Sequence, residues 1–102
     1  MEARRTYAIS RARYGLDGRT FDTLVVHHLH GKSGDVGPPM RFTRRETLAA
    51  LTSGRAFVTV IQLESGRYAQ EADVRLVLVD GVPYLRTDQL RIAEDQLELP
   101  EP

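Results

Sequence analysis

The stretch from residue 74 to residue 87 constrains the fold of this chain more than any other part of it. It reads Val-Arg-Leu-Val-Leu-Val-Asp-Gly-Val-Pro-Tyr-Leu-Arg-Thr. Asp80-Gly81 separates two β-rich runs, and this pair tolerates positive φ at both centres of a type I′ turn, so the stretch predicts a β-hairpin. Both faces of the first strand are largely apolar, which favours a position inside a sheet. Pro83 has no N–H, so we expect the return strand at a sheet edge or the proline at a non-bonded position.

Hydrophobic patterns predict the remaining elements. Alternating apolar residues indicate strands over residues 6–14, 21–29 and 56–62, while residues 68–73 lead into the hairpin. Thr43-Arg-Arg-Glu46 has the pattern of a capping box, and we expect a helix from there to about Ser53, with Gly54 as its left-handed C-terminal cap. The chain is therefore predicted to be an α+β domain. We expect a mainly antiparallel sheet of about five strands with one short helix packed on it, in the order β-β-α-β-β-β.

The length of 102 residues suits one domain, residues 1–102. Within it we expect a loose N-terminus over residues 1–5, a loop rich in glycine and proline over residues 31–40, and a closing tail over residues 88–102. There is no cysteine, which excludes disulfides and thiolate metal sites. No apolar run approaches the roughly 20 residues of a membrane span, and no apolar signal core follows the N-terminus. A cytoplasmic location and no membrane partner are expected.

Charge is unevenly distributed along a chain of zero net charge. Residues 1–51 hold nine basic and five acidic side chains, whereas residues 52–102 hold five and nine. Three arginines lie at or near the predicted helix start, where the helix dipole favours an anion. Two more lie earlier in the chain, on the first predicted strand beside Tyr14. Arginine suits planar recognition of phosphate. A nucleic-acid or anion surface is therefore one hypothesis, with candidate residues Arg41, Arg44, Arg45, Arg11 and Arg13.

The histidine cluster His27-His28-Leu29-His30 is the one group of metal-ligand residue types. On a strand, His28 and His30 share a face and could both reach a Zn²⁺ or Ni²⁺ ion. A closed site would need further ligands, such as Asp22 or Asp35. A half-exposed strand that happens to carry histidines on its polar face is the alternative interpretation. A metal-dependent enzyme built on His28 and His30 is accordingly a second alternative function.

Three segments resemble a family of small bacterial proteins known as DUF3892. They are Leu48-Ala-Ala-Leu-Thr-Ser-Gly54 before Phe57-Val58, then Val82-Pro-Tyr-Leu-Arg-Thr87, and a closing Asp95-Gln-Leu-Glu-Leu-Pro100. Members of the family read Gly-x-x-Tyr-Leu/Ile-Lys/Gln-Thr and finish near Asn-Leu-Leu-x-Leu-Pro. This chain has Gln96 at the usual asparagine, and it departs again at Glu98. The resemblance covers about residues 6–100 and implies a compact single domain without an assigned activity.

The sequence favours a non-enzymatic interaction module that binds a protein partner or a second copy of itself. No pattern of catalytic residues is recognisable, and no cofactor is expected. The strand that contains Pro83 is predicted to offer a sheet edge for pairing, and the oppositely charged halves suit head-to-tail contact between copies. Nucleic-acid binding and metal-dependent catalysis are the alternatives.

Overall fold

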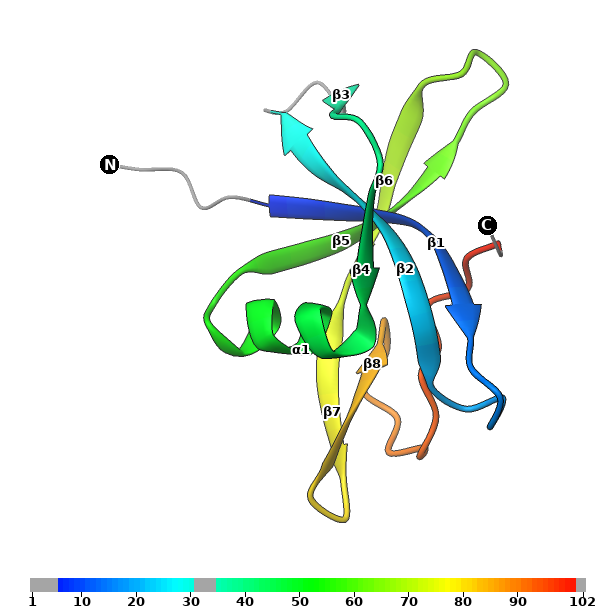
Figure 1. The fold of residues 1–102 in the computed structure, drawn as a ribbon. Coiled ribbons are helices and arrows are strands. Elements are labelled where there is room, and N and C mark those ends of the chain that lie inside the picture. Colours follow the sequence, from blue (N-terminus) through cyan, green and yellow to red (C-terminus); the bar gives the residue numbers. More distant parts are fainter. Residues whose placement is uncertain (1–5, 31–34, 101–102) are drawn as a thin grey trace.

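The computed structural model describes residues 6–30 and 35–100, and within them it contains eight strands and one helix. Chain order and colour can be followed in Figure 1. The elements are β1 (Thr6–Tyr14), β2 (Phe21–His30), β3 (Asp35–Val36), β4 (Met40–Thr43), α1 (Arg44–Thr52), β5 (Ala56–Gln62), β6 (Tyr68–Asp73), β7 (Arg75–Val79) and β8 (Val82–Arg86). The predicted α+β class with a single helix is confirmed. The predicted loose segment 1–5, residues 31–34 of the predicted loop and residues 101–102 of the tail lie outside the described residues.

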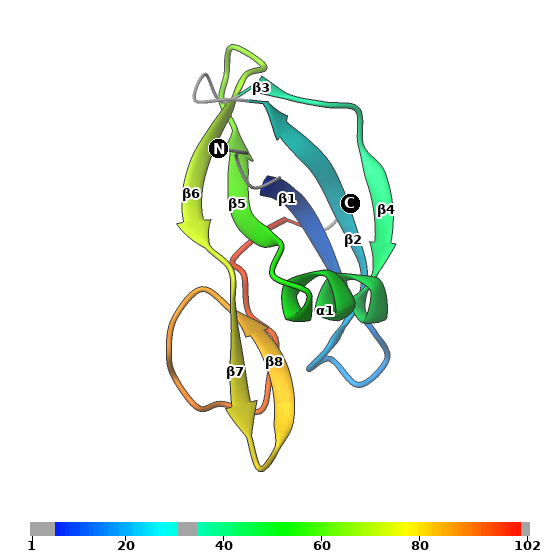
Figure 2. The same cartoon turned by 90° about the vertical axis from the view of Figure 1, so that its left-hand side faces the viewer.

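The main sheet is mixed and strongly curled into a half-barrel (Figure 2). Its strand order is β3-β2-β1-β5-β6, with β4 also paired to β2. β1 and β5 run parallel, whereas the other described pairs are antiparallel. The parallel pair exists because β4 and α1 carry the chain back across the sheet before β5 begins. A mainly antiparallel arrangement was therefore predicted correctly, but the sheet is not purely antiparallel.

Local sequence patterns predicted several element boundaries correctly. The strands predicted at residues 6–14 and 56–62 have those bounds. The capping box is present: the Thr43 side chain accepts from the Glu46 N–H, and the Glu46 side chain accepts from the Thr43 N–H. Gly54 adopts a φ of 97°, as expected of a C-terminal cap. The predicted loop 31–40 is wrong at Asp35–Val36, which forms the short strand β3 on the outer edge of β2, and at Met40, where β4 begins. The predicted order β-β-α-β-β-β therefore lacks two strands that precede the helix.

The predicted hairpin is present, but its predicted place in the fold is wrong. Asp80 and Gly81 have φ values of 51° and 80°, the positive pair that a type I′ turn requires. However, β7 and β8 form a two-stranded sheet of their own, so β7 is not an inner strand. Both views show the pair extending away from the half-barrel as an arm (Figures 1 and 2). We call β7 and β8 with their turn the arm.

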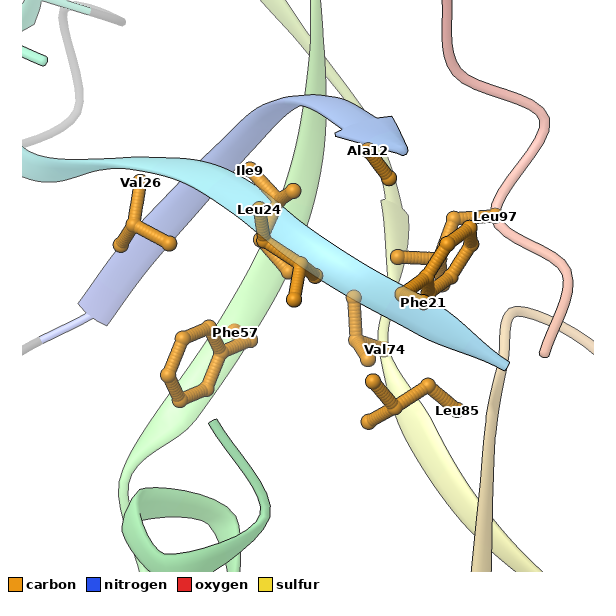
Figure 3. Packing of buried hydrophobic residues seen from close by; sticks show 9 residues of the cluster. All are labelled: Ile9, Ala12, Phe21, Leu24, Val26, Phe57, Val74, Leu85 and Leu97. Atoms are coloured by element: carbon orange, nitrogen blue, oxygen red, sulfur yellow. The ribbon is translucent and has the colours of Figure 1, made fainter. Parts of the chain in front are cut away.

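The principal core lies between one face of the main sheet, helix α1, the base of the arm and the tail. Its buried members come from strands far apart in the sequence (Figure 3), and Leu48, Ala50 and Leu51 of α1 pack against them. Leu97 of the tail is buried here too. The buried members are Ile9, Ala12, Phe21, Leu24, Val26, Phe57, Val74, Leu85 and Leu97.

A second, smaller cluster lies on the opposite face of the same strands. Ala8, Val58 and Val60 are buried there, with Leu29, Val36 and Tyr68 packed against them at the edges. Successive side chains of a strand point to opposite faces. β5 is therefore buried on both faces, which accounts for its almost uninterrupted apolar sequence.

Asp95 joins the tail to three other parts of the fold. Its carboxylate is fully buried and accepts from the backbone N–H of Phe21 at 2.8 Å and of Leu85 at 2.9 Å. The Arg44 guanidinium donates to both carboxylate oxygens, at 2.7 and 3.1 Å, and also to the Pro83 carbonyl oxygen at 2.6 Å. The Asp95 N–H donates to the Arg19 carbonyl oxygen, and the Tyr14 hydroxyl donates to the Asp95 carbonyl oxygen, which completes the junction. The arm is thereby fixed to the half-barrel.

Replacing Asp95 by alanine is expected to destabilise the fold by about 3–5 kcal/mol, because it leaves a partly buried arginine and two buried N–H groups without their acceptor. Equilibrium unfolding in urea measures this change. Glu64→Ala, in an exposed turn, is the control and should stay within about 0.5 kcal/mol of the parent. Equal unfolding midpoints for the two variants would contradict the role given to Asp95.

Candidate interaction surfaces

The outer edge of β8 is closed by contacts within the chain. In a two-residue hairpin, residues alternate between bonded pairs and pairs whose backbone groups point outward. Leu85 points outward: its N–H donates to Asp95, and its C=O accepts from the Gln96 N–H at 2.8 Å. Pro83 has no N–H, and its carbonyl oxygen is bound by Arg44. The expectation of an available edge on the proline-containing strand is therefore wrong.

The outer edge of β7 is open. Leu76 lies opposite Leu85, and Leu78 lies opposite Pro83, so the backbone groups of Leu76 and Leu78 point away from β8. Among the described residues, β7 pairs with no strand other than β8. Val74, just before the strand, is already bonded to the Phe57 carbonyl oxygen at 2.9 Å. The N–H and C=O groups of Leu76 and Leu78 thus form a short strand edge ready for pairing.

Exposed apolar side chains lie on the arm and on the segment that follows it. Leu78 is 60% exposed and Val82 46%, while Leu90 and Ile92 of the following segment are 56% and 45% exposed. A groove of about 460 Å³ runs beside β7 and is lined by Arg75 to Leu78 on one side and by Gln89 and Arg91 on the other. Large side chains of this kind, gathered beside an open strand edge, are typical of a protein-binding surface.

The strand register brings three of the predicted arginines onto one face. Arg11 lies opposite Val25, and Val25 lies opposite Arg41, so all three share a face of β1, β2 and β4. Arg13 projects from the same face, opposite Thr23. Arg11, Arg13 and Arg41 are exposed. We call these three residues the arginine face.

The other two predicted arginines do not join this face. Arg44 is held by Asp95 and has a structural role. Arg45 is exposed on α1. Tyr14, which was considered as a base-stacking residue, lies against Phe21 with ring centroids 4.8 Å apart and donates its hydroxyl to the Asp95 carbonyl. Burial, more than the nearby charges of Glu94 and Asp95, raises the pKa of Tyr14.

The two candidate metal ligands lie at the end of β2. His28 packs against the Tyr7 ring with centroids 5.1 Å apart, and His30 is exposed opposite Asp35 of β3. Asp22 is at the far end of the same strand, so it is not near them. In the part of the chain that the structure describes, no group of three or more histidine, aspartate or glutamate side chains is placed to hold a metal. The metal hypothesis stays a prediction.

A buried hydrogen-bonded pair escaped sequence reasoning. Ser10 Oγ lies 2.8 Å from His27 Nε2, and His27 Nδ1 lies 2.8 Å from the Gly37 carbonyl oxygen. Because a carbonyl only accepts, Nδ1 carries the proton and Nε2 accepts from the serine. Ser10 occupies a bulge in β1, which turns its side chain toward His27. Ser10 and His27 lie 17 residues apart on two strands, so no local sequence pattern pointed to the pair.

The pair resembles a nucleophile and its base in contact, but its surroundings favour a structural role. Ser10 and His27 are 7% and 4% exposed, and a carbonyl, not a carboxylate, orients the imidazole. The His27 ring also packs near Tyr68, with centroids 5.5 Å apart, on the face of the smaller cluster. The pair therefore satisfies two polar side chains within a largely apolar layer.

Comparison with known proteins identifies no relative: no family model, curated protein or solved structure matches the chain. The resemblance to the DUF3892 family accordingly stays a prediction. Over residues 6–30 and 35–100, no helix has the length and apolar character needed to cross a membrane.

Ser10→Ala is expected to destabilise the fold by about 1–3 kcal/mol, because buried His27 loses the donor to its Nε2 atom. Urea unfolding, compared with the exposed-turn control Ser65→Ala, measures the effect. In ¹⁵N spectra of the parent, the His27 ring should show the Nδ1–H tautomer. An Nε2–H tautomer, or a Ser10→Ala variant as stable as the control, would contradict the assignment.

Proposed function

We propose that this chain is a non-enzymatic protein-binding module that captures an extended segment as an added strand on β7. The open edge of Leu76 and Leu78 is the observation that carries the proposal. Strand addition supplies main-chain hydrogen bonds to such an edge, and the alternating side chains beside it supply selectivity. The flanking groove provides space along the edge, and Arg75 and Arg91 at its sides favour a segment with acidic residues.

The energetics of the arm support the same function. A hairpin of two strands alone is marginally stable in water, and a third strand or other packing is needed for independent stability. Leu85 and Leu76 pack the base of the arm on the principal core, but Leu78 and Val82 near its tip remain exposed. An added strand would therefore complete hydrogen bonds and cover apolar surface at once.

Selection from a displayed library of random peptides tests the proposal. The expected binders are extended segments with alternating apolar residues, and they should bind the parent but not Leu78→Pro, which removes an outward N–H while sparing the bonds between β7 and β8. Leu16→Lys, at a fully exposed leucine in the turn between β1 and β2, is the control and should retain binding. Peptides that bind Leu78→Pro as well as the parent would overturn the proposal.

Nucleic-acid binding is a second candidate, favoured by the arginine face. Arg11, Arg13 and Arg41 project from adjoining strands, so a phosphate backbone lying across β1, β2 and β4 could meet them in succession. The sheet face that they share is otherwise lined by Thr23, Val25 and Thr43. Zero net charge makes long-range attraction weak, so binding would depend on these local contacts.

If this second candidate is correct, a single-stranded oligonucleotide should bind in a strongly salt-dependent way. The combined change Arg13→Ala and Arg41→Ala should reduce the logarithmic salt slope by about 0.7 per arginine removed. Fluorescence anisotropy at several salt concentrations measures the slope. Arg55→Ala, at an exposed site beyond the end of α1, is the matched control. A slope equally affected by the control change would rule out the arginine face as the binding site.

A further inference from the structure

We propose that the segment added to β7 is β7 of a second copy, so that two arms join into one four-stranded antiparallel sheet about a two-fold axis. The proposal rests on the proposed function, because it uses the same open edge. It also fixes a register. The outward-pointing residues are Leu76 and Leu78, so each Leu76 pairs with Leu78 of the second copy, and the two Val77 residues face each other at the axis.

This register uses every backbone group that the β7 edge leaves open. In an antiparallel bonded pair, the two residues exchange both N–H···O bonds. Pairing Leu76 with Leu78 of the second copy, in both directions, therefore satisfies the N–H and C=O of both residues in each copy. Shifting the strands by two residues would instead bring Val74 or Asp80 opposite an outward leucine. Val74 already donates to Phe57, and Asp80 belongs to the turn, so shifted pairing is incomplete.

The side chains of β7 are complementary to their own copies. Leucine faces leucine and valine faces valine across the central pairs, all of them residue types that stabilise cross-strand contacts. At each end, Arg75 lies opposite Val79 of the second copy and next to its Asp80. Both of these charged residues are exposed, so opposite charges come near each other at the two ends of the pair. No like charges face each other within the strand.

The same arm excludes further growth of the sheet. The outer edge of β8 is closed by Pro83, which lacks an N–H, and by the bonds of Leu85 to Asp95 and Gln96. Each arm therefore brings one open edge, and a two-fold contact uses it completely. The expected product is a closed dimer and not a fibre. This asymmetry distinguishes a second copy from accidental aggregation of an exposed hairpin.

Mass measured by light scattering on a sizing column tests for the dimer. The parent should elute with twice the chain mass of 11.5 kDa and dissociate on dilution. Leu78→Pro removes one bond from each side of the two-fold axis, so it should weaken the dimer about a hundredfold, at roughly tenfold per hydrogen bond. Leu16→Lys should leave the dissociation constant unchanged. A circular dichroism spectrum like that of the parent shows that Leu78→Pro is folded.

Single cysteines test the register independently, because the chain has none of its own. Val77→Cys places two thiols opposite each other at a non-bonded pair, where the Cα atoms are about 4.5 Å apart, within the range for a disulfide. Under mild oxidation it should form a covalent dimer. Val79→Cys faces Arg75 of the second copy in this register, so it should stay largely uncrosslinked, as should Leu16→Cys.

The outcomes separate this inference from the function on which it rests. A parent that stays monomeric at high concentration, or cysteines at residues 77, 79 and 16 that crosslink equally, would overturn pairing between copies. Peptides selected on the open edge would then still support strand addition by a different protein. A dimer that persists in Leu78→Pro and lacks the Val77→Cys crosslink would place the contact elsewhere and also overturn the inference.

Discussion

The buried carboxylate of Asp95 is the interaction on which the arrangement of this fold depends. It joins the start of β2, the start of α1, strand β8 and the tail, which are far apart in the sequence. Removing a carboxylate and a guanidinium from water is costly, and the cost is offset only when the pair is well aligned and its remaining groups are hydrogen-bonded. Both conditions are met here: Arg44 contacts both oxygens, and two backbone N–H groups bind the carboxylate as well.

The same contacts give the arm its asymmetry. Asp95, Gln96 and Arg44 bind the outward groups of β8, so one side of the hairpin is joined to the rest of the molecule. Nothing equivalent binds β7 within the described residues. A hairpin has two edges, and a protein usually protects both from unwanted pairing. This fold protects one edge with a proline and a buried charge network, and it leaves the other edge apolar and accessible.

Features that depend on neighbouring residues could be predicted from the sequence. The Thr43 capping box, the Asp80-Gly81 turn and the bounds of β1 and β5 follow from local patterns. Features that depend on distant residues could not. The parallel pairing of β1 with β5 and the burial of Asp95 in an acidic tail require tertiary contacts that no local pattern specifies. The shared face of Arg11, Arg13 and Arg41 likewise depends on the register of three strands, and the separate arginine positions do not reveal it.

The largest disagreement between sequence and structure is also the most informative about function. The sequence of β7 is apolar on both faces, a pattern typical of a strand inside a sheet whose faces are both covered. In the single chain, however, β7 has a neighbour on one side and carries an exposed leucine. Local preference and native environment usually agree, and the places where they disagree tend to be functional. A further strand on the open side of β7, as proposed above, would lessen this disagreement, because it would bind the open backbone groups and place side chains beside the exposed leucine.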